Sequence, residues 1–144
     1  PEAISVLKRM AATYQVPYNR ICYDSDGLGN YIKGYLPGSY AFKGNARPLA
    51  KGDAKNLRSQ CFLRLAELVE LHLISFGVEG ITADEILSEA PHIKRLPDAD
   101  KPTIISKKDI KKTLGHSTDY LDPLMMRMVW TIRAPAKASH STQF

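Results

Sequence analysis

The chain has 144 residues, 44% hydrophobic and 24% charged, which argues against a disordered or fibrous protein. Twenty basic and fifteen acidic side chains give a net charge of +5, a mild excess that is compatible with a polyanionic partner. Two cysteines are too few for a disulfide framework, and there is neither a long apolar run nor a signal peptide. We therefore expect a cytoplasmic protein with no membrane partner.

In the first part of the chain, hydrophobic periodicity and turn residues predict helices and short strands in alternation. They cover residues 2–15 (helix), 20–24 (strand), 28–36 (helix), 39–43 (strand) and a helix from residue 54. The last of these is strongly amphipathic, and its spacing places inward Leu57, Cys61, Leu65, Leu68 and Val69.

Beyond this helix the local signals are mixed. Residues 72–76 read as a further strand, and Thr82 followed by Glu85 forms a capping box that predicts a helix over 83–94. The β-branched residues 103–106 predict another strand. We therefore assign the chain to the α/β class, although its strands are few for a sheet of that kind.

The C-terminal part begins with a short basic helix over residues 106–114, which Gly115 ends. A last helix should begin between Asp119 and Asp122, capped by Ser117 or Thr118, because Pro123 is tolerated only in a first turn. We take residues 1–133 as one domain, and the small polar residues 134–144 as a disordered tail.

The stretch ICYDSDGLG, residues 21–29, places two carboxylates at the end of an apolar strand. Ligand-binding groups in open α/β sheets gather beyond the carboxyl ends of strands, which is where Asp24 and Asp26 fall. The glycines that follow permit either a close approach to a ligand or simply a sharp turn. From these residues alone, an active-site corner and a plain turn both remain open.

A second acidic pair, Asp119 and Asp122, stands at the predicted start of the last helix. Acids in a first turn complement the helix dipole, so a structural role is one interpretation. Carboxylates from separate elements could also hold Mg²⁺ or Mn²⁺, which prefer oxygen ligands and leave room for phosphate oxygens. Such a metal site would activate water and stabilise the leaving oxygen in phosphodiester cleavage.

Basic side chains gather just before this second pair and, more loosely, before the long amphipathic helix. Either group could contact a nucleic-acid backbone or simply form a solvated face. The first group consists of Lys107, Lys108, Lys111 and Lys112, and the second of Arg47, Lys51, Lys55 and Arg58.

Taken together, three segments resemble the nuclease domain of tailed-phage terminase large subunits, over roughly residues 2 to 132. The segments are YDSDGLGNYIKGYLPGSYAFKGNARPL, KNLRSQCFLRLAEL and IISKKDIKKTLGHSTDYLDPLMMRM. They follow the family order of an acid ending a strand, an N-L-x-x-Q helix, and an S-K-x-x-x-K-x-x-x-G-x-S-x-D-x-x-D segment. Order and spacing together are more specific than any one motif.

The resemblance implies an RNase H-like mixed sheet flanked by helices, and a nuclease with three acids and two divalent metals, Mg²⁺ or Mn²⁺. Asp24 matches the family's second acid. Asp119 and Asp122 match the region of the family's third acid, and the resemblance does not decide which of the two binds metal. Asp26 would contact a metal ligand without binding the metal itself. The implied partners are double-stranded DNA, the terminase ATPase domain, the small terminase subunit and the portal.

The chain departs from the family in several places. Thr118 stands where the family commonly has proline, and Pro123 where it has alanine. The opening β-meander with the family's first acid has no match, and no G-x-x-x-x-G-K-[ST] motif of an ATPase occurs. We therefore expect a piece of a terminase, lacking the meander, with little or no nuclease activity alone.

Two interpretations from other classes stay open. A haloacid-dehalogenase-like phosphatase would use Asp24 as the nucleophile and Asp26 as acid and base, but Leu28 stands where that family usually has threonine. A non-catalytic DNA-binding or portal-docking module would keep the fold without the chemistry. Metal-dependent cleavage and phosphatase activity are the properties that separate these classes.

Overall fold

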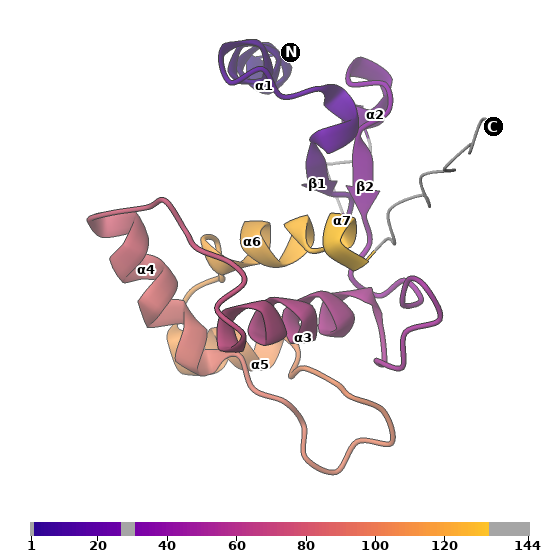
Figure 1. The fold of residues 1–144 in the computed structure, drawn as a ribbon, viewed down its shortest axis with the longest axis vertical. Helices are drawn as coiled ribbons and strands as arrows, with labels where there is room; N and C mark the ends of the chain where they lie inside the picture. The colour runs from indigo at the N-terminus through magenta and orange to yellow at the C-terminus, as the bar shows by residue number, and fades with distance from the viewer. Residues whose placement is uncertain (1, 27–30, 133–144) are drawn as a thin grey trace, which may run out of the picture. The chain divides into compact units, whose positions relative to one another are not determined.

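The computed structural model describes residues 2–26 and 31–132, and the chain divides into two compact units, residues 1–46 and 47–144 (Figure 1). Helices are combined with a small parallel sheet, which confirms the predicted α/β class. No helix in the described ranges is long and apolar enough to cross a membrane. The predicted tail over 134–144 lies outside the described residues.

The first unit contains a two-stranded parallel sheet. β1 (Cys22–Asp24) pairs with β2 (Tyr40–Phe42), and α2 (Ile32–Tyr35) lies in the connection between them. A parallel pair requires a crossover instead of a tight hairpin, so an intervening segment with a helical turn is expected. Both strands lie within the ranges predicted from the sequence.

A helix and a short turn precede the sheet. α1 (Glu2–Thr13) ends two residues before the predicted boundary and buries Ile4 and Ala11. The 3₁₀ turn η1 (Tyr18–Arg20) then leads into β1. The helix predicted over residues 2–15 is therefore confirmed.

The second unit is helical in its described part. α3 (Leu57–Glu70) packs against α6 (Leu121–Arg127) and α7 (Val129–Ile132), the helices that run beside it in Figure 1. The buried apolar side chains on these helices and at the junction of α6 and α7 include Leu57, Cys61, Phe62, Leu65, Leu68, Met125, Met128 and Val129. The inward stripe predicted for α3 is thus confirmed except for Val69, which lies past the packed surface and is 46% exposed.

Two further helices complete this unit. α4 (Ile81–Glu89) continues into the 3₁₀ turn η3 (Ala90–His92), and α5 (Lys107–Leu114) follows a long connection. Gly115 ends α5 with a left-handed φ of 91°, as its sequence position predicts. The short basic helix is confirmed within one residue.

Three local predictions for this unit are wrong. Residues 73–79 form no regular structure, because the described part of the unit offers no strand with which the segment could pair. Residues 103–106 contribute only an isolated bridge between Ile104 and Arg95. The capping box also fails, since α4 begins at Ile81 after Gly80, whose φ of 60° suits glycine, and Thr82 lies inside the helix.

Candidate functional site

Asp24 stands at the end of β1, in a corner held by backbone and side-chain hydrogen bonds. The buried Ser25 donates both its amide and its hydroxyl to the carbonyl of Phe42, at 2.9 and 2.8 Å. Asp24 is half-buried, and its Oδ1 accepts the amide of Asp26 at 3.0 Å. Asp26 itself is exposed, so its described contribution is to hold the Asp24 carboxylate through its backbone.

The geometry of this corner is compatible with both interpretations of the sequence, a plain turn and a ligand-binding site. The hydrogen bond from Asp26 to Asp24 is the Asx arrangement of a well-made turn. The same bond also fixes one oxygen of a carboxylate at the carboxyl end of a strand, where ligands are commonly bound. The glycines of the motif, Gly27 and Gly29, lie outside the described residues.

Asp119 and Asp122 differ sharply in their surroundings. Asp119 is exposed in the turn before α6, whereas Asp122 lies in the first turn of α6 with its side chain only 17% exposed. Asp122 Oδ2 is 3.2 Å from the ammonium of Lys107. Its other oxygen, Oδ1, is buried and has no hydrogen-bond partner. The two acids are therefore not equivalent as candidate ligands.

Arg58, in the first turn of α3, belongs to the same cluster. It is 7% exposed, its Nη1 donates to the carbonyl of Ile105 at 2.8 Å, and its guanidinium carbon lies 4.9 Å from the Phe62 ring centre. Its Nε and Nη2 are buried without a partner. Burial lowers the pKa of this guanidinium from its ordinary value, and the charge of Asp122 partly opposes that shift.

The burial of Arg58 corrects its interpretation as a surface group. The sequence placed it with Arg47, Lys51 and Lys55 in a loose basic set, but this guanidinium faces the interior of the unit and not a nucleic-acid backbone. We refer to Arg58, Lys107 and Asp122 as the charge cluster. It holds one carboxylate next to two cations.

Glu89 fixes the start of α6 and was not identified from the sequence. Its side chain is completely buried, and its two oxygens accept the amides of Tyr120 at 3.2 Å and Leu121 at 2.7 Å. The predicted cap by Ser117 or Thr118 is therefore wrong, because an acid from the end of α4 takes that place. The spacing of residues along one helix contains no signal for such a cap.

The N-L-x-x-Q segment, residues 56–60, holds the start of α3 and the loop before it. Asn56 caps α3 by accepting the amide of Ser59 at 2.9 Å. Gln60 accepts the amide of Leu49 at 2.7 Å and donates to its carbonyl at 2.8 Å. The loop that enters α3 is thereby tied to the helix.

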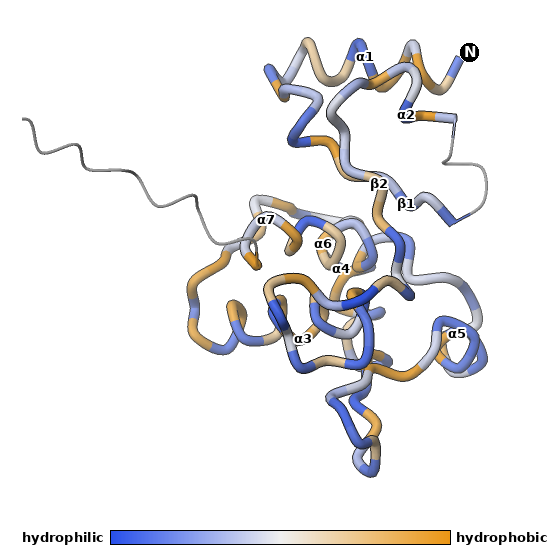
Figure 2. Tube along the Cα trace, turned by 90° about the vertical axis from the view of Figure 1, so that its right-hand side faces the viewer, coloured by the Kyte–Doolittle hydropathy of each residue, from blue (hydrophilic) through white to orange (hydrophobic). Residues whose placement is uncertain are grey.

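The candidate DNA-binding side chains lie on α5 and on this loop. The α5 lysines, Lys107, Lys108, Lys111 and Lys112, are exposed, and α5 is mostly hydrophilic in Figure 2. Arg47 and Lys51 are exposed on the loop before α3. On α5, Asp109 pairs with Lys112 at 3.1 Å, and hydrogen bonds from Ser106 and then Lys112 lower the pKa of Asp109.

Within the described part of each unit, no group of three Asp, Glu, His or Cys side chains lies close enough together to hold a metal ion. The buried, unpartnered Oδ1 of Asp122 could supply one oxygen ligand to a hard cation, but the positive charges of Arg58 and Lys107 lie beside the same carboxylate. Asp24 belongs to the first unit, and Asp119 and Asp122 to the second.

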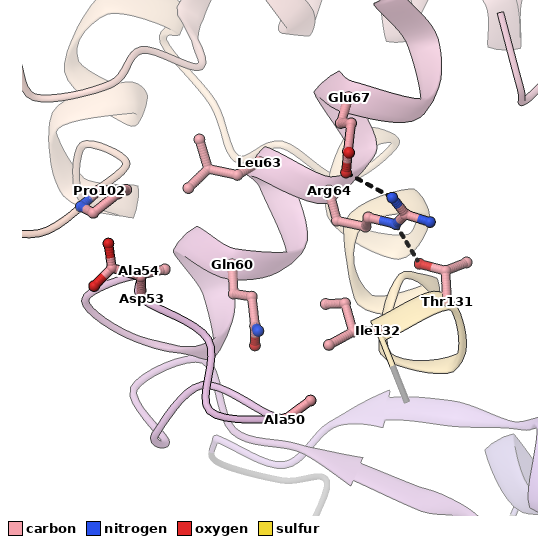
Figure 3. A pocket seen from close by; sticks show the side chains of 10 residues that line it. All are labelled: Ala50, Asp53, Ala54, Gln60, Leu63, Arg64, Glu67, Pro102, Thr131 and Ile132. Atoms are coloured by element: carbon pink, nitrogen blue, oxygen red, sulfur yellow. Dashed lines mark hydrogen bonds and ion pairs between the residues drawn. The ribbon is translucent and has the colours of Figure 1, made fainter. Parts of the chain in front are cut away.

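An open pocket of about 550 Å³ lies elsewhere in the second unit, beside α3 and α7 (Figure 3). Within it the guanidinium of Arg64 is held by Glu67 at 2.6 Å and by the Thr131 hydroxyl at 3.4 Å. None of the site residues predicted from the sequence lines it. Its lining residues are Ala50, Asp53, Ala54, Gln60, Leu63, Arg64, Glu67, Pro102, Thr131 and Ile132.

Comparison with known proteins gives no assignment. No protein-family model matches the chain, and searches of curated proteins and of solved structures found no significant match.

Proposed function

We propose that this chain is part of a terminase-type nuclease that cuts concatemeric phage DNA during packaging, with Mg²⁺ or Mn²⁺ as cofactor. Asp24 and Asp122 are its proposed metal ligands, and an RNase H-like arrangement is its proposed finer fold. The proposed partners are double-stranded DNA, an ATPase domain, a small subunit and a portal. The basis is the ordered resemblance of three segments, together with the chemistry of the charge cluster.

The observation that carries the proposal is the unpartnered oxygen of Asp122. A buried carboxylate oxygen without a hydrogen bond is costly unless a cation or water completes it. This favours Asp122 over Asp119, because Asp119 is exposed and needs no such partner. A divalent cation at Asp122 would supply an activated water and stabilise the leaving oxygen of a phosphodiester.

The distribution of charge supports DNA as the partner of α5. Residues 65–93 contain no lysine or arginine and six acids, so this stretch would repel a phosphate backbone. The four lysines of α5 are exposed by contrast. Phosphate contacts from such side chains give binding that weakens steeply with salt. The proposed DNA-binding surface is therefore α5 with Arg47 and Lys51.

Nicking of supercoiled plasmid in Mn²⁺ tests the proposal, since a single cut per molecule is scored and slow turnover remains visible. We expect at most slow nicking by the chain, because the family's first acid has no match in it, and the loss of that residual nicking in Asp24→Asn and in Asp122→Asn. Asp119→Asn is the matched control and should keep it. Nicking that survives both Asp24→Asn and Asp122→Asn would refute the assignment of these ligands.

A second candidate is a DNA-binding module without cleavage. The Lys107–Asp122 ion pair favours it, because that pair already supplies Asp122 with a cation. Salt-dependent retention of duplex DNA with no nicking in Mn²⁺ or Mg²⁺ would support this candidate over the nuclease.

A further inference from the structure

The second unit carries an acidic and apolar surface that runs from the end of α3 through the following connection to α4. The chain turns back at the end of α3, where the amide of Leu73 donates to the carbonyl of Leu68 at 2.8 Å. We refer to the exposed side chains of this stretch as the acidic surface. They include the apolar Val69, Leu71, Leu73, Val78, Ile81 and Leu87 and the acids Glu70, Glu79 and Asp84.

α4 shows most clearly that this surface lacks a packing partner within the described part of the unit. Glu89 is its only buried residue, while Ile81 is 76% and Leu87 is 70% exposed. A helix of this length is marginal in water and usually depends on packing of its apolar side chains. Exposed apolar side chains gathered on one surface mark a protein contact. The acids around them, with no lysine or arginine in residues 65–93, favour a basic partner.

In the first unit, α1 presents side chains of the complementary kind. Val6, Met10 and Tyr14 repeat every four residues and are 37%, 49% and 71% exposed, while Ile4 and Ala11 are buried. The amide of Tyr14 donates to the carbonyl of Met10 at 2.9 Å, which continues the helical turn past Thr13. Val6, Met10 and Tyr14 therefore form one exposed apolar stripe on α1.

The charges of α1 also suit the acidic surface. Lys8 and Arg9 are exposed, and Arg9 borders the stripe because it stands three residues after Val6. Glu2, at the other end of the helix, is its only acid. The basic helix α5 fits less well, because none of its large apolar side chains is exposed.

We propose that the acidic surface of one copy of this chain binds α1 of a second copy. The interface joins two different surfaces, so it is head-to-tail. This inference goes beyond the proposed nuclease function, and it involves neither Asp122 nor the lysines of α5. Because opposite charges meet across the interface, the association should weaken as sodium chloride rises from about 0.1 to about 0.5 M.

Sedimentation equilibrium of the full chain without DNA measures the association. We expect the average mass to rise above that of the monomer with concentration. Met10→Glu and Leu87→Lys should each raise the dissociation constant about tenfold or more, because each removes a buried apolar contact and adds a like charge. Leu96→Lys is the matched control, since Leu96 is 42% exposed outside both surfaces, and it should leave the association unchanged.

Mixing the two variants tests the head-to-tail arrangement directly. The Met10→Glu chain keeps an intact acidic surface, and the Leu87→Lys chain keeps an intact α1. An equal mixture should therefore form a one-to-one complex under conditions where each variant alone is monomeric. Contacts of α1 with α1, or of α4 with α4, would not be restored in this way.

Three results would overturn the inference. The first is an unaltered chain that stays monomeric up to about 1 mM. The second is association that only one of the two substitutions weakens, and the third is a mixture that stays monomeric. Circular dichroism checks that the variants fold; Tyr14→Glu and Ile81→Lys, at more exposed positions, replace any variant that does not.

Discussion

Replacing Glu89 with alanine should destabilise the second unit by about 3 kcal/mol. Each hydrogen bond to a charged acceptor contributes about 1.5–3 kcal/mol, and the Glu89 carboxylate accepts two at the start of α6. Water that enters the truncated site should recover part of that sum. Glu89→Gln keeps one acceptor oxygen and the side-chain volume, so we expect a loss of about 1.5 kcal/mol.

Urea unfolding followed by circular dichroism at the helix band measures these losses. Glu85→Ala is the matched control, because Glu85 is a half-buried glutamate one turn earlier in the same helix. It should shift the free energy of unfolding by less than about 0.5 kcal/mol. Equal losses in Glu89→Ala and Glu85→Ala would refute the assignment of Glu89 as the cap of α6.

Two further predictions concern the loop before α3 and the effect of Asp109, on α5, on stability at low pH. In Gly52→Ala, the new methyl group would collide with the Gln60 side-chain amide and break its hydrogen bonds to Leu49. Urea unfolding should therefore show a free energy of unfolding lower by about 1–2 kcal/mol. Asp109 has a lowered pKa, so its contribution to stability is present above the ordinary carboxyl pKa and is lost as pH falls through the folded value. Asp109→Asn should therefore flatten the acid side of the pH–stability curve, and an unchanged acid side would contradict this.

The phosphatase interpretation makes a different prediction for the same corner. A chain that used Asp24 as a nucleophile would hydrolyse p-nitrophenyl phosphate in Mg²⁺, and Asp24→Asn would abolish this activity. We expect no hydrolysis above background by the unaltered chain. Hydrolysis lost on Asp24→Asn would favour the phosphatase over the nuclease.

Local sequence signals predicted the elements whose boundaries depend on their own residues. Ser106 caps α5 by accepting the amide of Asp109, and Gly115 ends the helix in a left-handed conformation. Both signals can be read directly from residue type and spacing. The inward stripe of α3 followed in the same way from helical periodicity.

The predictions that failed depended on partners distant in the chain. A strand over residues 72–76 needs a neighbour, and the described part of the second unit provides none. The cap of α6 comes from Glu89, more than thirty residues before the amides it binds. No local pattern distinguishes this buried acid from the exposed acids around it.

The candidate site, too, could be predicted from the sequence only in part. Asp24 and the acidic pair could be selected from the sequence, because carboxylates next to a strand end or a helix start are visible in the pattern. The pairing of Lys107 with Asp122, and the burial of Arg58 beside them, bring together residues from three separate helices. Only tertiary packing distinguishes Asp122 from Asp119.

The most direct test of the metal role of Asp122 is a crystal of this chain soaked in Mn²⁺, examined by anomalous scattering. The account predicts a manganese peak at Asp122 Oδ1. A crystal that binds Mn²⁺ elsewhere, with the Lys107–Asp122 pair intact, would contradict it.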